Sequence, residues 1–224
     1  MRGFVKANGL SLFFGLIFVL ALVGQAVTGW SQFNDEQVAD HLAQISFGAY
    51  LTSASFAVDV TENWQSEYLQ FLLYIVATVF FLQRGSPESK EFSKVGLEGP
   101  KEQKVGRYAD EKSPKWAAVG GWRTGTFSWS LTLVMGAIFF ACWFVQSVGG
   151  WATYNETQLQ NLQDPVTWGG YLLRPEFWSR TLQNWQSEFL AVGSMAVLSI
   201  YLRQRGSPES KPVGAAHDQT GTEG

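Results

Sequence analysis

Residues Leu10–Val27 read LSLFFGLIFVLALVGQAV, and residues Leu131–Val148 read LTLVMGAIFFACWFVQSV. Neither run contains a charged residue, and each carries one strongly polar side chain near its end, Gln25 or Gln146. A helix of about 20 apolar residues crosses the hydrocarbon core of a bilayer. Both runs therefore predict transmembrane helices, and the chain is predicted to be an all-α integral membrane protein.

Two shorter apolar runs are Tyr68–Leu82 and Phe189–Leu202. They reach a spanning length only if their helices begin several residues earlier, near Asn63 and Asn184. The alternative for this pair is a buried helix of a soluble domain, which the two neighbouring runs disfavour. We predict four spans, over about residues 10–28, 63–82, 131–149 and 184–202.

The composition of the 224-residue chain argues against several classes of protein. Its net charge of −3 offers no basic face for nucleic acid. The lone Cys142 rules out an intrachain disulfide and a site built from several thiolates. Two separated histidines, His41 and His217, are too few for a bis-His haem or a His-based zinc site. We therefore predict no metal, no cofactor, no catalytic residue and no nucleic-acid partner.

Basic residues predict the orientation in the membrane. Fourteen of the sixteen Lys and Arg residues lie before the first span, between the second and third, or after the fourth. The loop Thr28–Glu62 contains none, and the loop Gly149–Gln183 contains only Arg174 and Arg180. Because cytoplasmic loops are enriched in Lys and Arg, both termini are expected in the cytoplasm.

The chain also contains an internal repeat at an offset of 121 residues. Over the 81 residue pairs from Leu10/Leu131 to Lys90/Lys211, 30 are identical. The word NWQSE occurs at 63–67 and again at 184–188, and QRGSPESK occurs at 83–90 and again at 204–211. Each copy carries two spans, so both copies enter the membrane in the same direction. This pattern predicts a parallel repeat about a pseudo-two-fold axis along the membrane normal.

The repeat predicts the division of the chain. We expect membrane repeat 1 over residues 1–91, a flexible cytoplasmic linker over 92–122, membrane repeat 2 over 123–211 and a disordered cytoplasmic tail over 212–224.

Each extracytoplasmic loop is expected to contain a short amphipathic helix. In the first loop Asn34 resembles an N-cap before an acidic turn, and Val38, Leu42 and Ile45 follow at near-helical spacing. Phe47–Tyr50 then predicts a glycine-containing bend anchored by aromatic side chains.

One candidate site is a cluster of polar side chains at the outer ends of the spans. Asn63 and Glu67 stand four residues apart and share a helix face. Two-fold symmetry would bring Glu67 and Glu188 together, where the pair could bind a cation or share a proton. The alternatives are helix capping by Asn63 and binding of a partner or lipid. The cluster comprises Gln25, Asn63, Gln65, Glu67, Gln146, Asn184, Gln186 and Glu188.

A second candidate is the repeated motif on the inner face. Its Arg, Gly and Pro residues are typical of a helix C-terminus, whereas the identity of the remaining letters has no such reason. The motif could dock a cytoplasmic partner or anionic lipid, or could simply reflect a recent duplication. Its polar members are Arg84, Ser86, Glu88, Lys90, Arg205, Ser207, Glu209 and Lys211.

The twinned NWQSE and RGSPESK words resemble a family of small bacterial four-helix membrane proteins catalogued only as a domain of unknown function. The resemblance extends from the first span to Lys211 and implies a multi-pass protein of the bacterial inner membrane. It implies no catalytic or binding residue.

Three functions remain open from the sequence. We favour a non-enzymatic binding or scaffold module in the lipid bilayer, with a membrane-protein partner or a second copy of the chain. One alternative is a small channel or transporter with an outer acidic site at Glu67 and Glu188. The other is a quinone- or lipid-binding subunit of a membrane enzyme.

Overall fold

The computed structural model describes residues 2–221, and every regular element in that range is a helix. This agrees with the predicted all-α class. The elements are α1 (Arg2–Ala7), α2 (Gly9–Ala39), α3 (Phe47–Leu51), α4 (Ala54–Phe80), η1 (Phe92–Lys94), η2 (Gly106–Tyr108), α5 (Lys115–Ala118), α6 (Gly121–Ser128), α7 (Ser130–Gln160), α8 (Trp168–Tyr171) and α9 (Pro175–Tyr201).

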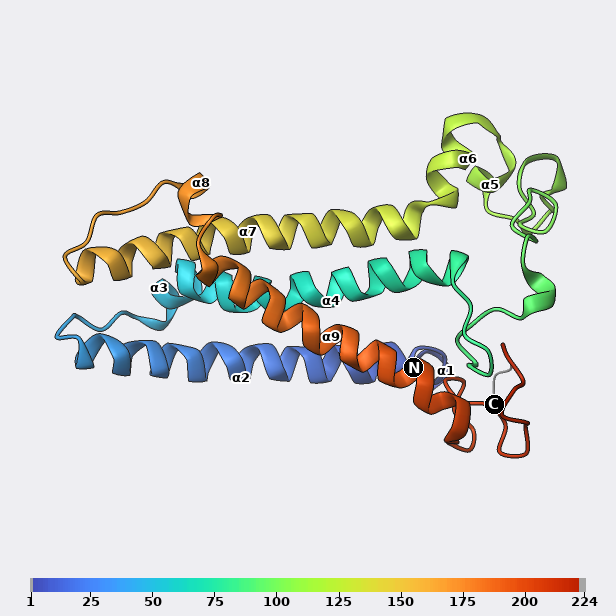
Figure 1. Ribbon diagram of the computed structural model, residues 1–224, viewed down its shortest axis with the longest axis horizontal. Helices are drawn as coiled ribbons and strands as arrows, with labels where there is room; N and C mark the ends of the chain where they lie inside the picture. Colours follow the sequence, from blue (N-terminus) through green and yellow to red (C-terminus); the bar gives the residue numbers. More distant parts are fainter. Residues whose placement is uncertain (1, 222–224) are drawn as a thin grey trace. The chain divides into compact units, whose positions relative to one another are not determined.

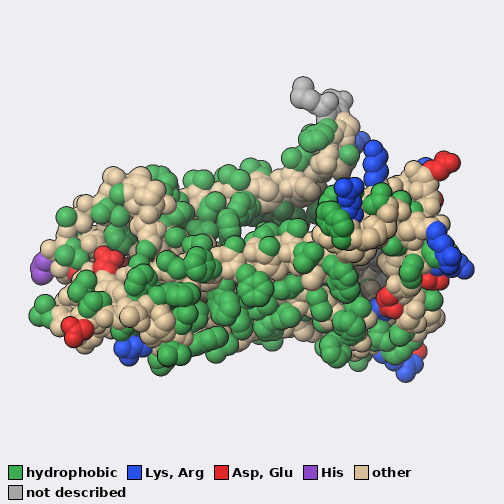
Figure 2. All heavy atoms as spheres, turned by 90° about the horizontal axis from the view of Figure 1, so that it is seen from above, with side chains coloured by type: hydrophobic (Ala, Val, Ile, Leu, Met, Phe, Trp, Pro, Cys, Tyr) green, Lys and Arg blue, Asp and Glu red, His purple; other side chains and the backbone are tan. Residues whose placement is uncertain are grey.

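Helices α2 and α7 are the two elements that are long and apolar enough to cross a membrane. Each has 31 residues and is unbroken (Figure 1). At 1.5 Å per residue each is about 46 Å long. Only 6% of the most apolar window of α2, and 28% of that of α7, is buried. On the face drawn in Figure 2, hydrophobic side chains cover much of the surface of the long helices, as expected for helices with an apolar environment.

The prediction of a separate amphipathic helix beginning at Asn34 is wrong. Helix α2 continues through this residue to Ala39, and residues 42–46 form no helix. No proline interrupts this part of the chain, so the helix continues beyond its apolar run. Asn34 is buried and caps no helix. Its side chain instead bonds the backbone of the loop that returns after α2.

The predicted helix starts near Asn63 and Asn184 are also wrong. Helices α4 and α9 begin at Ala54 and Pro175, nine residues before Asn63 and Asn184. Asn63 is therefore an interior helical residue and not an N-cap. The start of α9 suits Pro175, because proline lacks an N–H and its fixed φ matches the first helical position.

The predicted aromatic bends are one-turn helices, α3 and α8. Ser46 Oγ accepts a hydrogen bond from the Ala49 N–H at 3.2 Å, and Thr167 Oγ1 accepts one from the Gly170 N–H at 3.1 Å. These N-caps satisfy helical N–H groups that have no partner within the helix.

The chain divides into two compact units. Unit 1 comprises Met1–Thr61 and Val145–Leu173, and unit 2 comprises Glu62–Phe144 and Arg174–Gly224. Unit 1 contains α2, α3, α8 and the adjoining parts of α4 and α7. Unit 2 contains α9, the remaining parts of α4 and α7, and the segment 92–122, in which the structure has η1, η2, α5 and the start of α6.

Candidate functional site

In unit 1 each long helix binds the loop that follows it through one tryptophan and one asparagine. Trp30 Nε1 donates to the Ile45 carbonyl at 2.8 Å, and Asn34 Oδ1 accepts a hydrogen bond from the Ile45 N–H at 2.8 Å. The contacts recur 121 residues later, where Trp151 and Asn155 bond the backbone of Val166 at 2.7 and 2.8 Å. Each loop is thus held along its helix, which positions the short helix after it.

A buried tyrosine from each short helix then packs on the long helix. Tyr50 is 1% exposed and Tyr171 is 2% exposed. A Cβ atom at Gly29 would lie 2.3 Å from the Tyr50 hydroxyl, and one at Gly150 would lie 2.5 Å from the Tyr171 hydroxyl. Only glycine leaves room for the tyrosine at these two helical positions.

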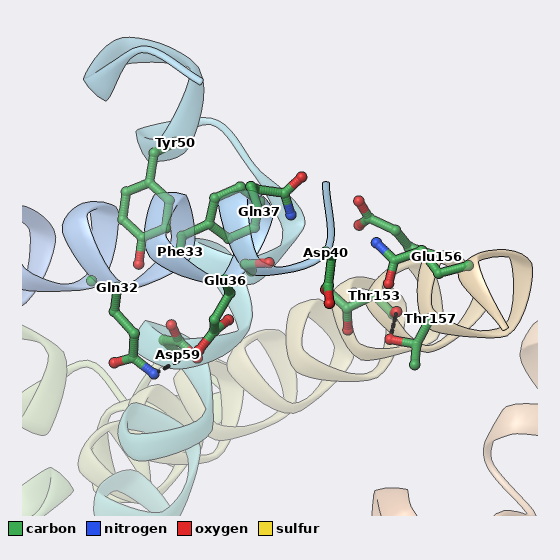
Figure 3. Close-up of a pocket in the computed structure, with 13 residues that line it drawn as sticks. Gln32, Phe33, Glu36, Gln37, Asp40, Tyr50, Asp59, Thr153, Glu156 and Thr157 are labelled. Carbon is green, nitrogen blue, oxygen red and sulfur yellow. Dashed lines mark hydrogen bonds between the residues drawn. The ribbon is translucent and has the colours of Figure 1, made fainter. Parts of the chain in front are cut away.

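Beside Tyr50, unit 1 contains a cavity of about 380 Å³ that the sequence did not predict. Its lining side chains come from α2, α3, the start of α4 and the far part of α7 (Figure 3). Four of them are carboxylates, Glu36, Asp40, Asp59 and Glu156, and none is Lys or Arg. We call this hollow the acidic cavity.

The charge around the acidic cavity is one-sided. The stretches Thr28–Thr61 and Val145–Leu173 together contain six Asp or Glu residues and no Lys or Arg. Such an excess produces a negative potential that attracts cations. Burial raises the pKa of Tyr50, and the carboxylates of Asp59 and Glu36 raise it further. The signal in the sequence is the absence of basic residues from these stretches, which also predicts the orientation.

The second copy does not reproduce the carboxylates. The positions equivalent to Glu36, Asp40 and Asp59 are occupied by Thr157, Asn161 and Arg180, in that order. The tryptophan, asparagine, glycine and tyrosine contacts are nevertheless the same in both copies. The shared fold therefore does not require acids at these positions.

The structure distributes the predicted outer polar cluster over both units. Gln25 and Gln146 belong to unit 1, and the other six members belong to unit 2. Gln146 is 2% exposed, and its Oε1 atom has no hydrogen-bond partner among the described residues. Gln65 is fully buried, Asn184 and Glu188 are half-buried, and Asn63, Glu67 and Gln186 are exposed.

Within unit 2 the cluster joins α4 to α9. Arg180 donates to one oxygen of Glu62 at 2.7 and 2.9 Å, and Asn184 donates to the other oxygen at 2.9 Å. Trp185 Nε1 donates to the Gln65 side chain at 2.8 Å. These contacts give Asn184 and Gln65 a role in helix packing. Glu62 and Arg180 were not predicted as site residues, because neither residue lies in a repeated word.

The repeated inner-face motif forms the same turn twice. Ser89 Oγ accepts a hydrogen bond from the Gln83 N–H at 3.0 Å, and Ser210 Oγ accepts one from the Gln204 N–H at 2.9 Å. The hydroxyl of the last serine therefore closes each turn after its helix ends.

The first serine of each motif stabilises the same turn through a hydrogen bond within the motif. Ser86 Oγ accepts from the Glu88 N–H at 3.3 Å, and Ser207 Oγ accepts from the Glu209 N–H at 3.2 Å. Side-chain bonds of this kind replace backbone partners in turns. They explain on structural grounds why both serines and the spacing recur.

The charged members of the motif differ between the copies. Lys90 Nζ donates to the Val79 carbonyl at 2.9 Å, at the end of α4. Lys211 is fully buried, and its Nζ donates to three carbonyl oxygens of the following segment at 2.8 to 3.2 Å. A guanidinium nitrogen of Arg84 lies 3.6 Å from a carboxylate oxygen of the exposed Asp218. The Arg205 side chain is exposed.

The C-terminal segment, described as far as residue 221, makes specific contacts with the first motif. The Gly85 N–H donates to Thr220 Oγ1 at 2.9 Å, and the Gly221 N–H donates to the Ser86 carbonyl at 3.1 Å. The composition of this segment predicted a disordered tail. Composition alone does not reveal the specific hydrogen bonds that a segment makes. Residues 222–224 of that tail lie outside the described residues.

The fold defines an all-helical protein with two candidate membrane-spanning helices. The chain belongs to the family described as Domain of unknown function (DUF6766), whose model matches residues 1–222. The predicted resemblance to a family of unknown function is thus confirmed. No curated protein and no solved structure matches the chain.

Proposed function

We propose that this chain is a four-span protein of the bacterial inner membrane and that it binds a ligand at its extracytoplasmic face without catalysing a reaction. The observation that carries the binding role is the acidic cavity, because it gathers carboxylates from three helices in a hollow of about 380 Å³. Pockets of this size typically hold small ligands.

Several observations support the four spans. Helices α4 and α9 have 27 residues each, and at 1.5 Å per residue their length of about 40 Å exceeds the bilayer core. The starts of α2, α4 and α3 recur 121 residues later as the starts of α7, α9 and α8. A head-to-tail duplication of one helical pair with its outer cap explains this recurrence. Together with the uneven distribution of the basic residues, this duplication supports a topology with both caps outside the membrane and both termini in the cytoplasm.

A cysteine-accessibility experiment tests this topology. Cys142 is the sole cysteine, so Cys142→Ser gives a background without thiols. Single cysteines are then introduced at Val38 and Leu159, two exposed positions that are 121 residues apart, and at the exposed Ser93 and Gly214. We expect a membrane-impermeant maleimide to label the first pair in intact spheroplasts. The second pair should react only after permeabilisation.

Two results would contradict the topology. Labelling of the Val38 and Leu159 positions from opposite sides would exclude a parallel duplication. Labelling of the Ser93 position in intact spheroplasts would exclude a cytoplasmic linker. Expression of each variant at the wild-type level in the membrane fraction is the control for folding.

A further inference from the structure

We propose that residues 112–129, which contain α5 and α6 and which we call the α5–α6 segment, dock on anionic phospholipid head groups of the cytoplasmic leaflet. The inference rests on the proposed topology, because it requires this segment to lie on the cytoplasmic side of the membrane.

All charged side chains of the α5–α6 segment are positive. The segment contains Lys112, Lys115 and Arg123 and no Asp or Glu. All three are exposed, and among the described residues none of them forms an ion pair. The preceding stretch, residues 92–111, contains four basic and four acidic residues. The positive excess is therefore confined to the part of the connector next to α7, where it complements an anionic membrane surface.

The same segment exposes large apolar side chains beside these cations. Trp116 is 45% exposed, Val119 59% and Trp122 71%. The guanidinium carbon of Arg123 lies 5.6 Å from the ring centroid of Trp122, so a cation and an indole share one patch of surface. Indole rings favour the membrane interface, where the ring meets hydrocarbon and the N–H stays hydrated. A surface that combines exposed indoles with unpaired cations matches a layer of anionic head groups.

Contacts within the α5–α6 segment hold this surface in shape. Thr124 is buried, and its Oγ1 donates to the Trp116 carbonyl at 2.7 Å. The rings of Trp116 and Trp122 meet edge to face with their centroids 6.1 Å apart. Gly120 and Gly121 form the turn between the two helices with φ of +74° and +64°, values that favour glycine. Because the surface is formed before a lipid arrives, docking orders few side chains.

The chain connects this surface directly to a candidate membrane-spanning helix. Only Trp129 separates α6 from α7, and its backbone is not helical (φ −114°, ψ 11°), so the chain bends there (Figure 1). The apolar run of α7 begins two residues later, at Leu131. A helix that leaves the axis of a spanning helix at its end has the direction needed to lie in the plane of the interface.

A fluorescent label on the α5–α6 segment tests the proposal in the full-length protein. In the Cys142→Ser background, Val119→Cys carries an environment-sensitive fluorophore, and the protein is reconstituted in nanodiscs. Nanodiscs of phosphatidylcholine are compared with nanodiscs in which phosphatidylglycerol replaces part of it. We expect a blue shift of the emission, and quenching by spin-labelled lipid, that both increase with phosphatidylglycerol. The same label at Val95→Cys, an exposed position in the charge-balanced stretch, should show neither change.

Matched substitutions test the cations. One cation near an anionic surface contributes about 1 kcal/mol, so Lys115→Gln and Arg123→Gln should each lower the ratio of docked to free label about fivefold. Lys101→Gln is the control, because Lys101 is also exposed but lies in the charge-balanced stretch. An equal loss in Lys101→Gln would show attraction by net charge alone and would contradict a specific surface.

Two further results would overturn the inference. The same blue shift in both kinds of nanodisc would show insertion of the indoles without selection of anionic lipid. A blue shift with added polyglutamate, but none with phosphatidylglycerol, would assign the surface to an acidic protein. Nanodiscs expose both faces of the bilayer, so this experiment reports docking whichever side the segment occupies. Labelling of the Ser93 position in intact spheroplasts would instead reject the topology.

Discussion

Tyr50 and Tyr171 pack their hydroxyls against helices at points where the side chain is a hydrogen atom. The sequence contains the signals for both halves of this contact, since Gly29 and Gly150 precede the repeated tryptophans. It contains no signal that pairs a particular glycine with a particular tyrosine, because that pairing depends on the path of the loop between them. The gathering of carboxylates around the cavity beside Tyr50 could not be predicted for the same reason.

Alkaline pH should destabilise the protein through Tyr50. Burial raises the pKa of Tyr50 above 10.0, and Asp59 and Glu36 add to the effect. Above pH 10.0 the unfolded chain therefore ionises this group before the folded protein does, and the free energy of unfolding falls. Thermal unfolding followed by fluorescence should show a smaller fall in Tyr50→Phe than in wild type.

The control for this measurement is Tyr108→Phe in the exposed segment between the halves. That variant should lose stability above pH 10.0 as the wild type does. A Tyr50→Phe protein that loses as much stability as the wild type would contradict the assignment to Tyr50.

The repeated motif shows which structural roles a short sequence pattern predicts and which it does not. Arg, Gly and Pro predicted a helix end, and both helices end within the three residues that precede each motif. The structure adds that Ser89 and Ser210 accept backbone N–H groups. This role was not predicted, because serine makes such bonds in many turns and its partner depends on the local fold.

Hydropathy underestimated the length of the two long apolar helices. The apolar runs located α2 and α7 correctly, but both helices extend about eleven residues beyond the predicted spans. Hydropathy reports which residues suit lipid, whereas a helix continues until its backbone bonds are interrupted. The polar extensions carry Asn34, Glu36 and Glu156. Helical segments that hydropathy assigns to loops therefore line part of the acidic cavity.

The contact between α4 and α9 should depend on the Glu62–Arg180 ion pair. The Arg180 side chain is 40% exposed and the Glu62 side chain is 15% exposed, so solvent screens the pair only in part. A double-mutant cycle with Glu62→Gln and Arg180→Gln, measured by thermal unfolding, should give a coupling free energy of about 1 kcal/mol.

The control cycle uses the ion pair Lys104–Asp110 in the segment between the halves. Both side chains are exposed, and Lys104 Nζ lies 2.9 Å from a carboxylate oxygen of Asp110. Its coupling should be close to zero. Equal coupling in the two cycles would show that the contact between the helices gains nothing from the ion pair.

Across the whole chain, the recurrence of sequence at an offset of 121 residues could be found from the sequence, and the functional difference between the two halves could not. Thirty identities predicted the repeat, and the helix bounds recur at the same offset. The acids of one half and Arg180 of the other are substitutions at matching positions. Their meaning depends on which side chains share a cavity, which no alignment of the two halves reveals.

Removal of the C-terminal segment should affect the first half of the chain. Deletion of residues 212–224 removes Thr220, the acceptor for the Gly85 N–H. Loss of one hydrogen bond of about 1 kcal/mol should speed exchange of that amide by about fivefold. Hydrogen-exchange mass spectrometry should show this at Gly85.

The amide of Gln83 is the control, since its acceptor Ser89 lies far from the deletion in sequence. Faster exchange at both amides would indicate general unfolding. Unchanged exchange at Gly85 would mean that its bond to Thr220 is not populated in solution.

Gly85 and Thr220 are separated by 135 residues, so their hydrogen bond closes a loop of the polypeptide that contains every element from η1 to α9. Until Thr220 has left the ribosome, the Gly85 amide has no access to this acceptor. The turn after α4 can therefore reach its final state only after helices α7 and α9 have been synthesised.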